Sequence, residues 1–233
     1  MTRIEGAIAL VTGGQRGLGR AFTEELLARG AAKVYVTARK PGAADDSRIV
    51  PLELEVTDQD SVAAVADRAT DVNIVINNAG VLRPAPLLQA EMADVVETFE
   101  TNVFGPLRIA QAFAPILAAN GGGALVDMHS VLSWSSGAAA YGASKAALWS
   151  LTNSLRIELA AQGTQVVGVH LGFAETDMVK AIDTVKLSPA TVAAALADGL
   201  EQGANEVLVD EFTRQVKATL SGPVENLVLP FRR

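Results

Sequence analysis

Apolar runs alternate with amphipathic segments along the whole chain. The short apolar runs predict strands near residues 7–12, 33–38, 49–54, 72–76, 123–129, 165–170 and 206–210. Segments with helical spacing between them predict helices near residues 18–29, 59–69, 91–118, 141–161 and 189–202. Runs that are apolar at consecutive positions are typical of strands buried on both faces. The alternation therefore predicts an α/β fold, a doubly wound parallel sheet of about seven strands with helices on both faces.

Length and composition indicate one domain. The chain has 233 residues, of which 49% are hydrophobic and only 5% aromatic, which suits a sheet core of Ala, Val and Leu. No repeat, linker or low-complexity tract divides it. We expect a single domain over residues 1–233, with a short substrate loop around 172–190 and a C-terminal tail over 211–233.

Charge and cysteine content narrow the classes of partner. The formal net charge of −7 argues against nucleic acid or an anionic membrane as a partner. No secretory signal or membrane span is evident in the sequence. The absence of cysteine excludes disulfides and cysteine–metal sites, and no metal site is predicted. A cytoplasmic location is the simplest expectation.

A glycine-rich turn follows the first apolar run. The segment from Thr12 to Gly19 leads from this predicted strand into an amphipathic helix. Glycines in this context permit a tight turn and close approach of the backbone to a pyrophosphate at the helix N-terminus. This pattern predicts a Rossmann-type dinucleotide site. Its predicted contacts in the turn are Gly13, Gln15, Arg16, Gly17, Leu18 and Gly19.

The end of the second predicted strand indicates which dinucleotide binds. An NAD site usually carries a carboxylate there to bind the ribose 2′-hydroxyl. This chain has Arg39 instead, and Arg16 in the glycine turn offers a second cation. Guanidinium groups bind phosphate through several donors, so the sequence favours NADP(H) over NAD(H).

Tyr141 and Lys145 lie four residues apart in a predicted helix. This spacing places a phenol and an ammonium on one helix face. A nearby ammonium favours phenolate, so we expect a lowered pKa for Tyr141 and proton exchange with a substrate oxygen.

Further motifs complete a set. The sequence Asn77-Asn78-Ala79-Gly80 ends a predicted strand, Asn102 lies in a long predicted helix, and Ser130 follows another apolar run. Together with the glycine turn and the Tyr141–Lys145 pair, they resemble the short-chain dehydrogenase/reductase family over roughly residues 5 to 210. The resemblance is to its compact single-domain branch.

The resemblance implies a role for each matching residue. Tyr141 would be the general acid in carbonyl reduction, and Lys145 would lower its pKa and bind the nicotinamide ribose. Ser130 would hydrogen-bond the substrate oxygen, and Asn102 would support a water in a proton relay. Further cofactor contacts are expected from Glu55, Val56, Asn78, Ala79, Gly80, Gly172 and Thr176.

Several positions depart from the family pattern or leave alternatives open. Leu171 replaces the usual proline before Gly172, and Glu55 replaces the usual aspartate near the adenine. Ser133 is a rival for the serine role. Trp134 could line a substrate pocket or serve as a hydrophobic cover. Both histidines, residues 129 and 170, are expected to be structural.

The sequence predicts an NADPH-dependent enzyme that reduces ketones or aldehydes, with a small-molecule carbonyl or alcohol as its substrate. The alternatives are an imine or enone reductase on the same scaffold, or a non-catalytic NADP(H)-binding sensor. Apolar residues expected near the reactive carbon favour hydrophobic or aromatic substrates, and they are Leu82, Leu132, Trp134, Phe173 and Met178. Small residues in the two long predicted helices favour a homodimer or homotetramer.

Overall fold

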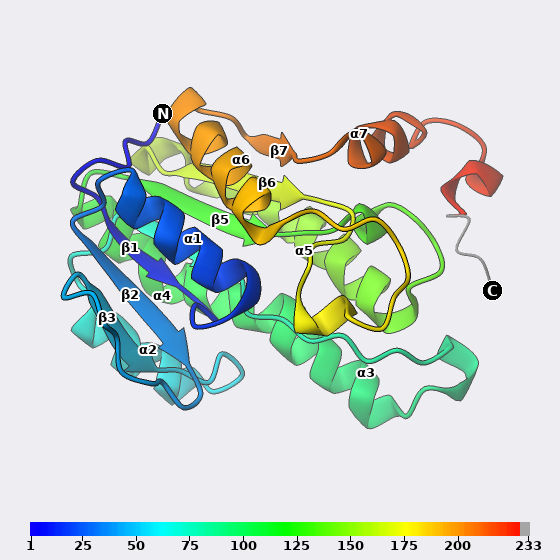
Figure 1. The fold of residues 1–233 in the computed structure, drawn as a ribbon, viewed down its shortest axis with the longest axis horizontal. Coiled ribbons are helices and arrows are strands. Elements are labelled where there is room, and N and C mark those ends of the chain that lie inside the picture. The colour runs from blue at the N-terminus through cyan, green and yellow to red at the C-terminus, as the bar shows by residue number, and fades with distance from the viewer. Residues whose placement is uncertain (229–233) are drawn as a thin grey trace.

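The computed structural model describes residues 1–228, in which seven strands form one parallel sheet (Figure 1). The strand order is β3-β2-β1-β4-β5-β6-β7. The order reverses between β1 and β4, and ligands of such sheets bind beyond the carboxyl ends of the strands at this point. The strands are β1 (Ile8–Val11), β2 (Lys33–Ala38), β3 (Ile49–Glu53), β4 (Ile74–Asn77), β5 (Ala124–Met128), β6 (Gln165–His170) and β7 (Glu206–Leu208).

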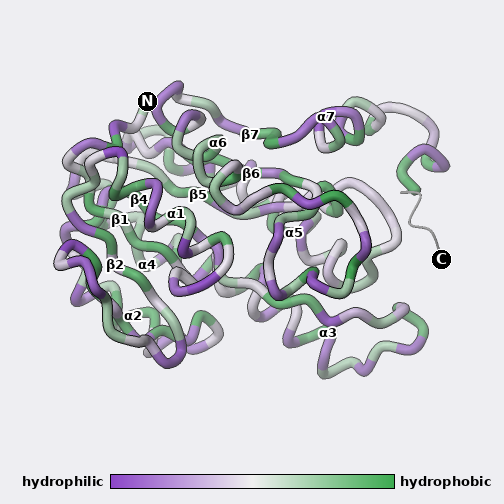
Figure 2. The backbone as a smooth tube through the Cα atoms, viewed as in Figure 1, coloured by the Kyte–Doolittle hydropathy of each residue, from purple (hydrophilic) through white to green (hydrophobic). Residues whose placement is uncertain are grey.

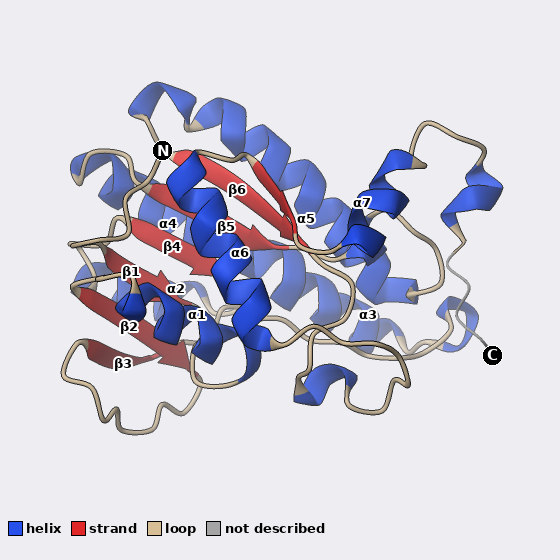
Figure 3. Cartoon of the chain, turned by 45° about the horizontal axis from the view of Figure 1, so that its top comes forward, coloured by secondary structure: helices blue, strands red, loops and turns tan. Residues whose placement is uncertain are grey.

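Helices cover both faces of the sheet (Figure 3). The first core cluster joins the sheet to α1 (Gly17–Ala28) and α6 (Pro189–Gln202). The second cluster joins the other face to α2 (Gln59–Arg68) and α4 (Gly105–Ala119), and α5 (Ala139–Glu158) packs on β6. The predicted doubly wound sheet of seven strands is confirmed.

Alternate residues of the strands enter the two cores. On β1, Ala9 and Val11 belong to the first cluster and Leu10 to the second, and all three are fully buried. Figure 2 shows hydrophobic colour along the strands. Because both faces are covered, the strands need apolar side chains at consecutive positions, which is the pattern that made them predictable.

The long helix expected over 91–118 is interrupted. It consists of α3 (Met92–Phe99), a π-helical turn (Glu100–Phe104) and α4. Pro106 has no N–H to donate to the carbonyl of Asn102 four residues earlier, and its ring crowds that carbonyl. The wider turn removes this conflict, and it places Asn102 at a backbone irregularity of a kind frequent at functional sites.

The C-terminal region contains a helix that the sequence reading missed. The chain continues after β7 into α7 (Glu211–Ala218) and a 3₁₀ turn (Val224–Leu227). The predicted tail over 211–233 is therefore helical in its first part, and its last five residues lie outside the described residues. The helix expected over 141–161 ends at Glu158 and is followed by a separate 3₁₀ turn.

Candidate active site

The glycines in the turn after β1 occupy positions that do not accept a larger residue. Gly13 and Gly17 have φ values of +63° and +53°. A Cβ on Gly19 would lie 2.3 Å from the carbonyl oxygen of Gly13, which is closer than atoms can approach. The turn is therefore a cradle made of backbone.

The start of α1 is suited to an anion. Its N-cap residue, Arg16, makes no side-chain capping bond, and the first turn contains no acidic residue. The first N–H groups of a helix lack partners within the helix, and they attract phosphate together with the helix dipole. This cradle fits the pyrophosphate of a dinucleotide and contains the six residues predicted for that role.

The turn after β4 is hydrogen-bonded to the glycine turn. The side-chain amide of Asn78 donates to the carbonyls of Thr12 at 2.9 Å and Gly13 at 3.2 Å. The Thr12 hydroxyl accepts from the N–H groups of Asn78 at 2.9 Å and Ala79 at 3.0 Å. Thr12 is a residue that the sequence reading did not single out, although its position directly after β1 and before the glycines was the available signal.

Arg39 and Arg16 are both exposed at the carboxyl edge of the sheet. The amide of Gln15 makes a reciprocal pair with the backbone of Gly42, at 3.1 Å and 3.0 Å. This pair joins the loop after β2 to the glycine turn. The segment that follows Arg39 is thereby held against the glycine turn that contains Arg16.

Glu55 and Val56 follow β3 and differ in environment. The Glu55 carboxylate accepts from the N–H and hydroxyl of Thr57, at 3.2 Å and 3.0 Å. Val56 is buried, and a Cβ on Gly105 would lie 3.0 Å from its Cγ2. Val56 thus packs against the start of α4, while Glu55 is engaged by its own turn.

Ser130 and Tyr141 meet at the carboxyl end of β5. Ser130 caps a 3₁₀ turn (Val131–Ser133), and its Oγ accepts from the N–H of Leu132 at 3.2 Å. Its hydroxyl also lies beside the phenol of Tyr141, in the first turn of α5, where it acts to lower the pKa of that phenol. The rival Ser133 instead accepts from the N–H of Ser130 at 3.4 Å, closing the capping box of that turn. The geometry favours Ser130 as the partner of the phenol.

Tyr141 has a raised rather than a lowered pKa. Loss of hydration raises the pKa of Tyr141 to about 12, against a smaller lowering by the Ser130 hydroxyl. Lys145 does not offset this, because its Nζ donates to the carbonyl of Met128 at 2.7 Å and lies 5.8 Å from the centre of the tyrosine ring. The lowering expected from the sequence is wrong for this arrangement, in which the ammonium faces a carbonyl.

Lys145 is itself buried, with 6% of its surface exposed. Burial lowers the pKa of Lys145 to about 8, and the buried carboxylate of Asp127 acts in the opposite direction. Asp127 accepts from Asn77 at 2.9 Å and from Thr152 at 2.7 Å. The buried carboxylate of Asp127 therefore favours the charged form of Lys145.

Asn102 clamps the loop after β4. Its Oδ1 accepts from the N–H of Val81 at 2.9 Å, and its Nδ2 donates to the Val81 carbonyl at 2.9 Å and to Ser144 at 3.1 Å. Ser144, a residue missed from sequence, precedes Lys145 on α5. The Asn102 side chain thus connects this loop to the helix of the candidate catalytic pair.

The loop after β6 reaches the glycine turn. A Cβ on Gly17 would lie 3.2 Å from Cγ2 of Thr176. Gly172, at the start of this loop, donates its N–H to Asp210 at 2.9 Å. Leu171, which stands where a proline was expected, is buried in the first core cluster. The structure thus brings Thr176 and the phosphate cradle together.

Trp134 is a hydrophobic cover. It is buried, stacks on His170 with ring centres 4.1 Å apart, and meets Trp149 edge-on at 5.8 Å. His170 also stacks on His129, with ring centres 4.5 Å apart. Burial lowers the pKa of His170 to about 3, so this ring is neutral and serves packing. Of the other residues expected near the reactive carbon, Met178 is 45% exposed and Leu132 packs beside Trp134.

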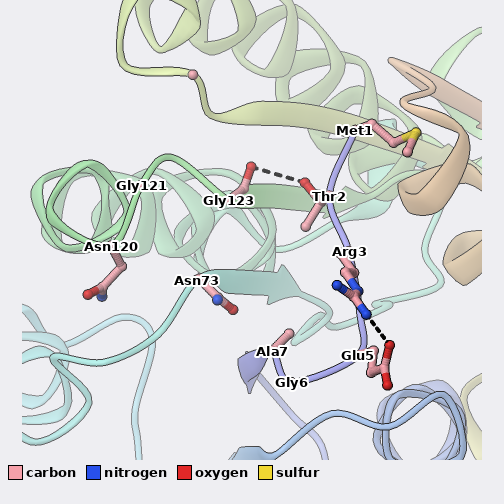
Figure 4. A pocket seen from close by; sticks show the side chains of 11 residues that line it. Met1, Thr2, Arg3, Glu5, Gly6, Ala7, Asn73, Asn120, Gly121 and Gly123 are labelled. Atoms are coloured by element: carbon pink, nitrogen blue, oxygen red, sulfur yellow. Dashed lines mark hydrogen bonds and ion pairs between the residues drawn. The ribbon is translucent and has the colours of Figure 1, made fainter.

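A groove of about 320 Å³ lies at the opposite edge of the sheet (Figure 4). It is lined by the N-terminal residues and by turns that precede β1, β4 and β5, among them Ala7, Asn73 and Gly123. Thr2 donates to the carbonyl of Gly123 across it, at 3.2 Å. The candidate catalytic residues follow the carboxyl ends of strands, so this groove is separate from them.

Comparison with known proteins identifies the class. Residues 7–186 match the short chain dehydrogenase family. The chain is 35% identical to the 3-oxoacyl-(acyl-carrier-protein) reductase FabG of Salmonella typhimurium, over 76% of this chain and 78% of the relative. It is 34% identical to FabG of Escherichia coli K12, over 87% and 88%. The chain belongs to the short chain dehydrogenase family and is an oxidoreductase of that family.

A solved structure has the same fold over nearly the whole length. A short chain dehydrogenase from Burkholderia cenocepacia, crystallised in complex with NADP, is 37% identical with a TM-score of 0.90. The match covers 97% of each chain. The resemblance inferred from the motifs is therefore confirmed.

Proposed function

We propose that this oxidoreductase reduces a ketone or aldehyde to an alcohol with NADPH, in a reversible reaction. The observation that carries the proposal is that the Ser130 hydroxyl and the Tyr141 phenol lie side by side, near buried Lys145 and at the sheet edge that holds the glycine cradle. A phenol and a hydroxyl that already converge can both reach one substrate oxygen.

NADP(H) is the proposed cofactor because two guanidinium groups flank the cradle. Arg16 and Arg39 offer donors for a 2′-phosphate. The related Burkholderia cenocepacia enzyme, which was crystallised with NADP, supports this assignment. We propose a cytoplasmic location, because a reductase of this kind draws on the metabolic pool of NADPH.

Each catalytic side chain has a distinct task in the proposed reaction. NADPH, when bound, supplies the hydride. The Tyr141 phenol is protonated at neutral pH because its pKa is raised to about 12, and it donates its proton to the carbonyl oxygen. Ser130 hydrogen-bonds that oxygen as negative charge develops. Lys145 places a positive charge behind the phenol, and Asn102 fixes the loop and helix that frame it.

A substrate panel tests this function against its alternatives. We expect NADPH fluorescence to decay with aryl and long-chain ketones faster than with imines or enones. Decay only with an imine or an enone would assign the scaffold to that chemistry. Tight NADPH binding without decay on any compound would indicate a sensor. A short 3-oxoacyl thioester belongs in the panel, because two relatives are 3-oxoacyl reductases.

The same panel tests the proposed preference for hydrophobic or aromatic substrates. The loop over residues 172–190 is short, and it pairs with itself through backbone bonds between Phe173 and Leu187 at 2.8 Å and between Glu175 and Leu187 at 2.9 Å. Met178 is 45% exposed on it. A strong preference for a small anionic ketone over aryl ketones would contradict this proposal.

We also propose a homodimer or homotetramer. Apolar side chains are exposed along α3, the π-helical turn and the end of α5, including Met92 at 69%, Phe104 at 43% and Ile157 at 80%. Exposed apolar surface along two long helices is typical of a subunit contact. Light scattering at micromolar concentration is expected to give at least twice the chain mass of 24.2 kDa. A monomer under these conditions would contradict the prediction.

A further inference from the structure

The segment that follows β7 contacts two loops of the candidate active site. Residues 209–228 leave the sheet at the carboxyl end of β7, and α7 lies beyond the ends of β6 and β7 (Figure 1). One contacted loop begins at Gly172 and leads to Thr176, and the other follows Ser130. Neither the proposed chemistry nor the cofactor assignment uses this segment.

Asp210 joins α7 to the first of these loops. Its Oδ1 accepts from the N–H of Thr213 at 2.6 Å and so caps α7. Its Oδ2 accepts from the N–H of Gly172 at 2.9 Å. A Cβ on Gly172 would lie 3.2 Å from that same oxygen and 3.3 Å from the Phe212 ring. The loop is therefore seated closely on the start of α7.

The second loop is held by packing and by backbone bonds. Lys217 of α7 lies over the Trp134 ring, 5.5 Å from its centre, and Val216 packs in the same cluster. The carbonyl of Leu227 accepts from the N–H of Ser136 at 2.8 Å and from its hydroxyl at 3.2 Å. Trp134 is four residues from Ser130, so this contact lies close to the candidate catalytic serine.

Asp210 accepts more hydrogen bonds than a helix cap requires. A cap needs one acceptor, and asparagine or serine supplies it as well as aspartate does. Asp210 uses both carboxylate oxygens, each for an N–H from a different segment. Only a carboxylate presents two acceptors in this way. The second oxygen therefore has a task outside α7, which is to fix the start of the loop that carries Thr176.

We propose that Asp210 is a positioning residue for the nicotinamide end of the cofactor, acting through the backbone of Gly172. The inference rests on the proposed function and on the family resemblance, which implies that Thr176 contacts the carboxamide of the nicotinamide. Release of the Gly172 N–H lets the loop from Gly172 to Thr176 move relative to the glycine cradle. Cofactor affinity and turnover then fall together, while the fold remains.

Asp210→Asn separates the two tasks of the carboxylate. The amide has one acceptor, which can still cap α7, and its NH₂ group cannot accept from Gly172. We expect the dissociation constant for NADPH to rise about tenfold, because binding must then also order the released loop. The melting temperature is expected to fall by about 2–4 °C, because one hydrogen bond is lost while the cap is retained.

Two further variants distinguish positioning from stability. Asp210→Ala removes the cap as well as the loop bond, so we expect the same tenfold loss of affinity with a melting temperature lower by about 4–8 °C. Glu211→Gln removes an equal charge one residue away, affects only the exposed contacts with Arg214 and Gln215, and is expected to leave both quantities unchanged. Affinity measured from NADPH fluorescence needs no substrate, so failure of the proposed reaction is detected separately. Unchanged NADPH affinity in Asp210→Asn, or an affinity that falls further in Asp210→Ala in step with its lower stability, would overturn the proposal.

Discussion

Tyr141→Phe is expected to lower turnover by roughly 10²- to 10⁴-fold, the effect of removing a general acid. NADPH affinity is expected to change less than about twofold, because the phenyl ring keeps its place and only the hydroxyl is lost. The physical reason is that this hydroxyl, which lies beside Ser130, is the proposed proton donor to the developing alcohol oxygen. Steady-state kinetics on the best carbonyl substrate of the panel, together with NADPH titration, measures both quantities.

The chain offers a matched control for this variant. Tyr35 is one of two tyrosines, and its hydroxyl donates to Asp71 at 3.0 Å, away from the candidate site. Tyr35→Phe removes the same atom and is expected to cost about 1 kcal/mol of stability without loss of turnover. If Tyr141→Phe retained as much turnover as the control Tyr35→Phe, the proton-transfer role of Tyr141 would be rejected.

Parts of the fold that depend on burial were predictable from sequence. The inner strands β1, β4 and β5 are apolar at nearly all positions because both faces of the sheet are covered there, so the local sequence is enough to locate them. The glycine turn was predictable for a different reason. Positions such as Gly19, where a Cβ would lie 2.3 Å from a carbonyl oxygen, allow no other residue.

Parts that depend on a local competition between contacts were not predictable. Helical spacing runs through residues 91–118, and only the missing N–H of Pro106 signals the π-helical turn at Asn102. The spacing of Tyr141 and Lys145 fixes a shared helix face but not the partner of the ammonium, which is the Met128 carbonyl. The raised pKa of Tyr141 follows from its loss of hydration, which the ammonium does not offset in this position.

The C-terminal segment shows how a functional contact can escape a motif search. Its helix is short and mostly exposed, so it lacks a strong apolar pattern. The available signal was Asp210 before Glu211, two residues after the end of β7, which is the composition of a helix start. Even so, a cap predicts one bond of the carboxylate, and the bond to Gly172 becomes visible only when β6 and β7 are placed side by side.

Arg39→Asp is expected to shift cofactor preference from NADPH towards NADH. Arg39 is exposed at the end of β2, and the pair between Gln15 and Gly42 holds the following loop against the glycine turn beside Arg16. Loss of two charge-assisted bonds to a 2′-phosphate amounts to ~3 kcal/mol or more, roughly a hundredfold in catalytic efficiency with NADPH. The introduced carboxylate repels that phosphate and can accept a hydrogen bond from the ribose hydroxyl of NADH.

The measurement is the ratio of kcat/KM values for the two cofactors, in the unmodified protein and in the variant. Arg20→Gln is the control, because Arg20 lies on α1 close to the cradle in sequence but forms an exposed pair with Glu24 at 2.7 Å. Its removal is expected to leave the ratio unchanged, since an exposed pair of this kind contributes little. Equal efficiencies of the unmodified protein with NADH and NADPH would contradict the assignment, because Arg16 and Arg39 would then bind no phosphate that distinguishes the two cofactors.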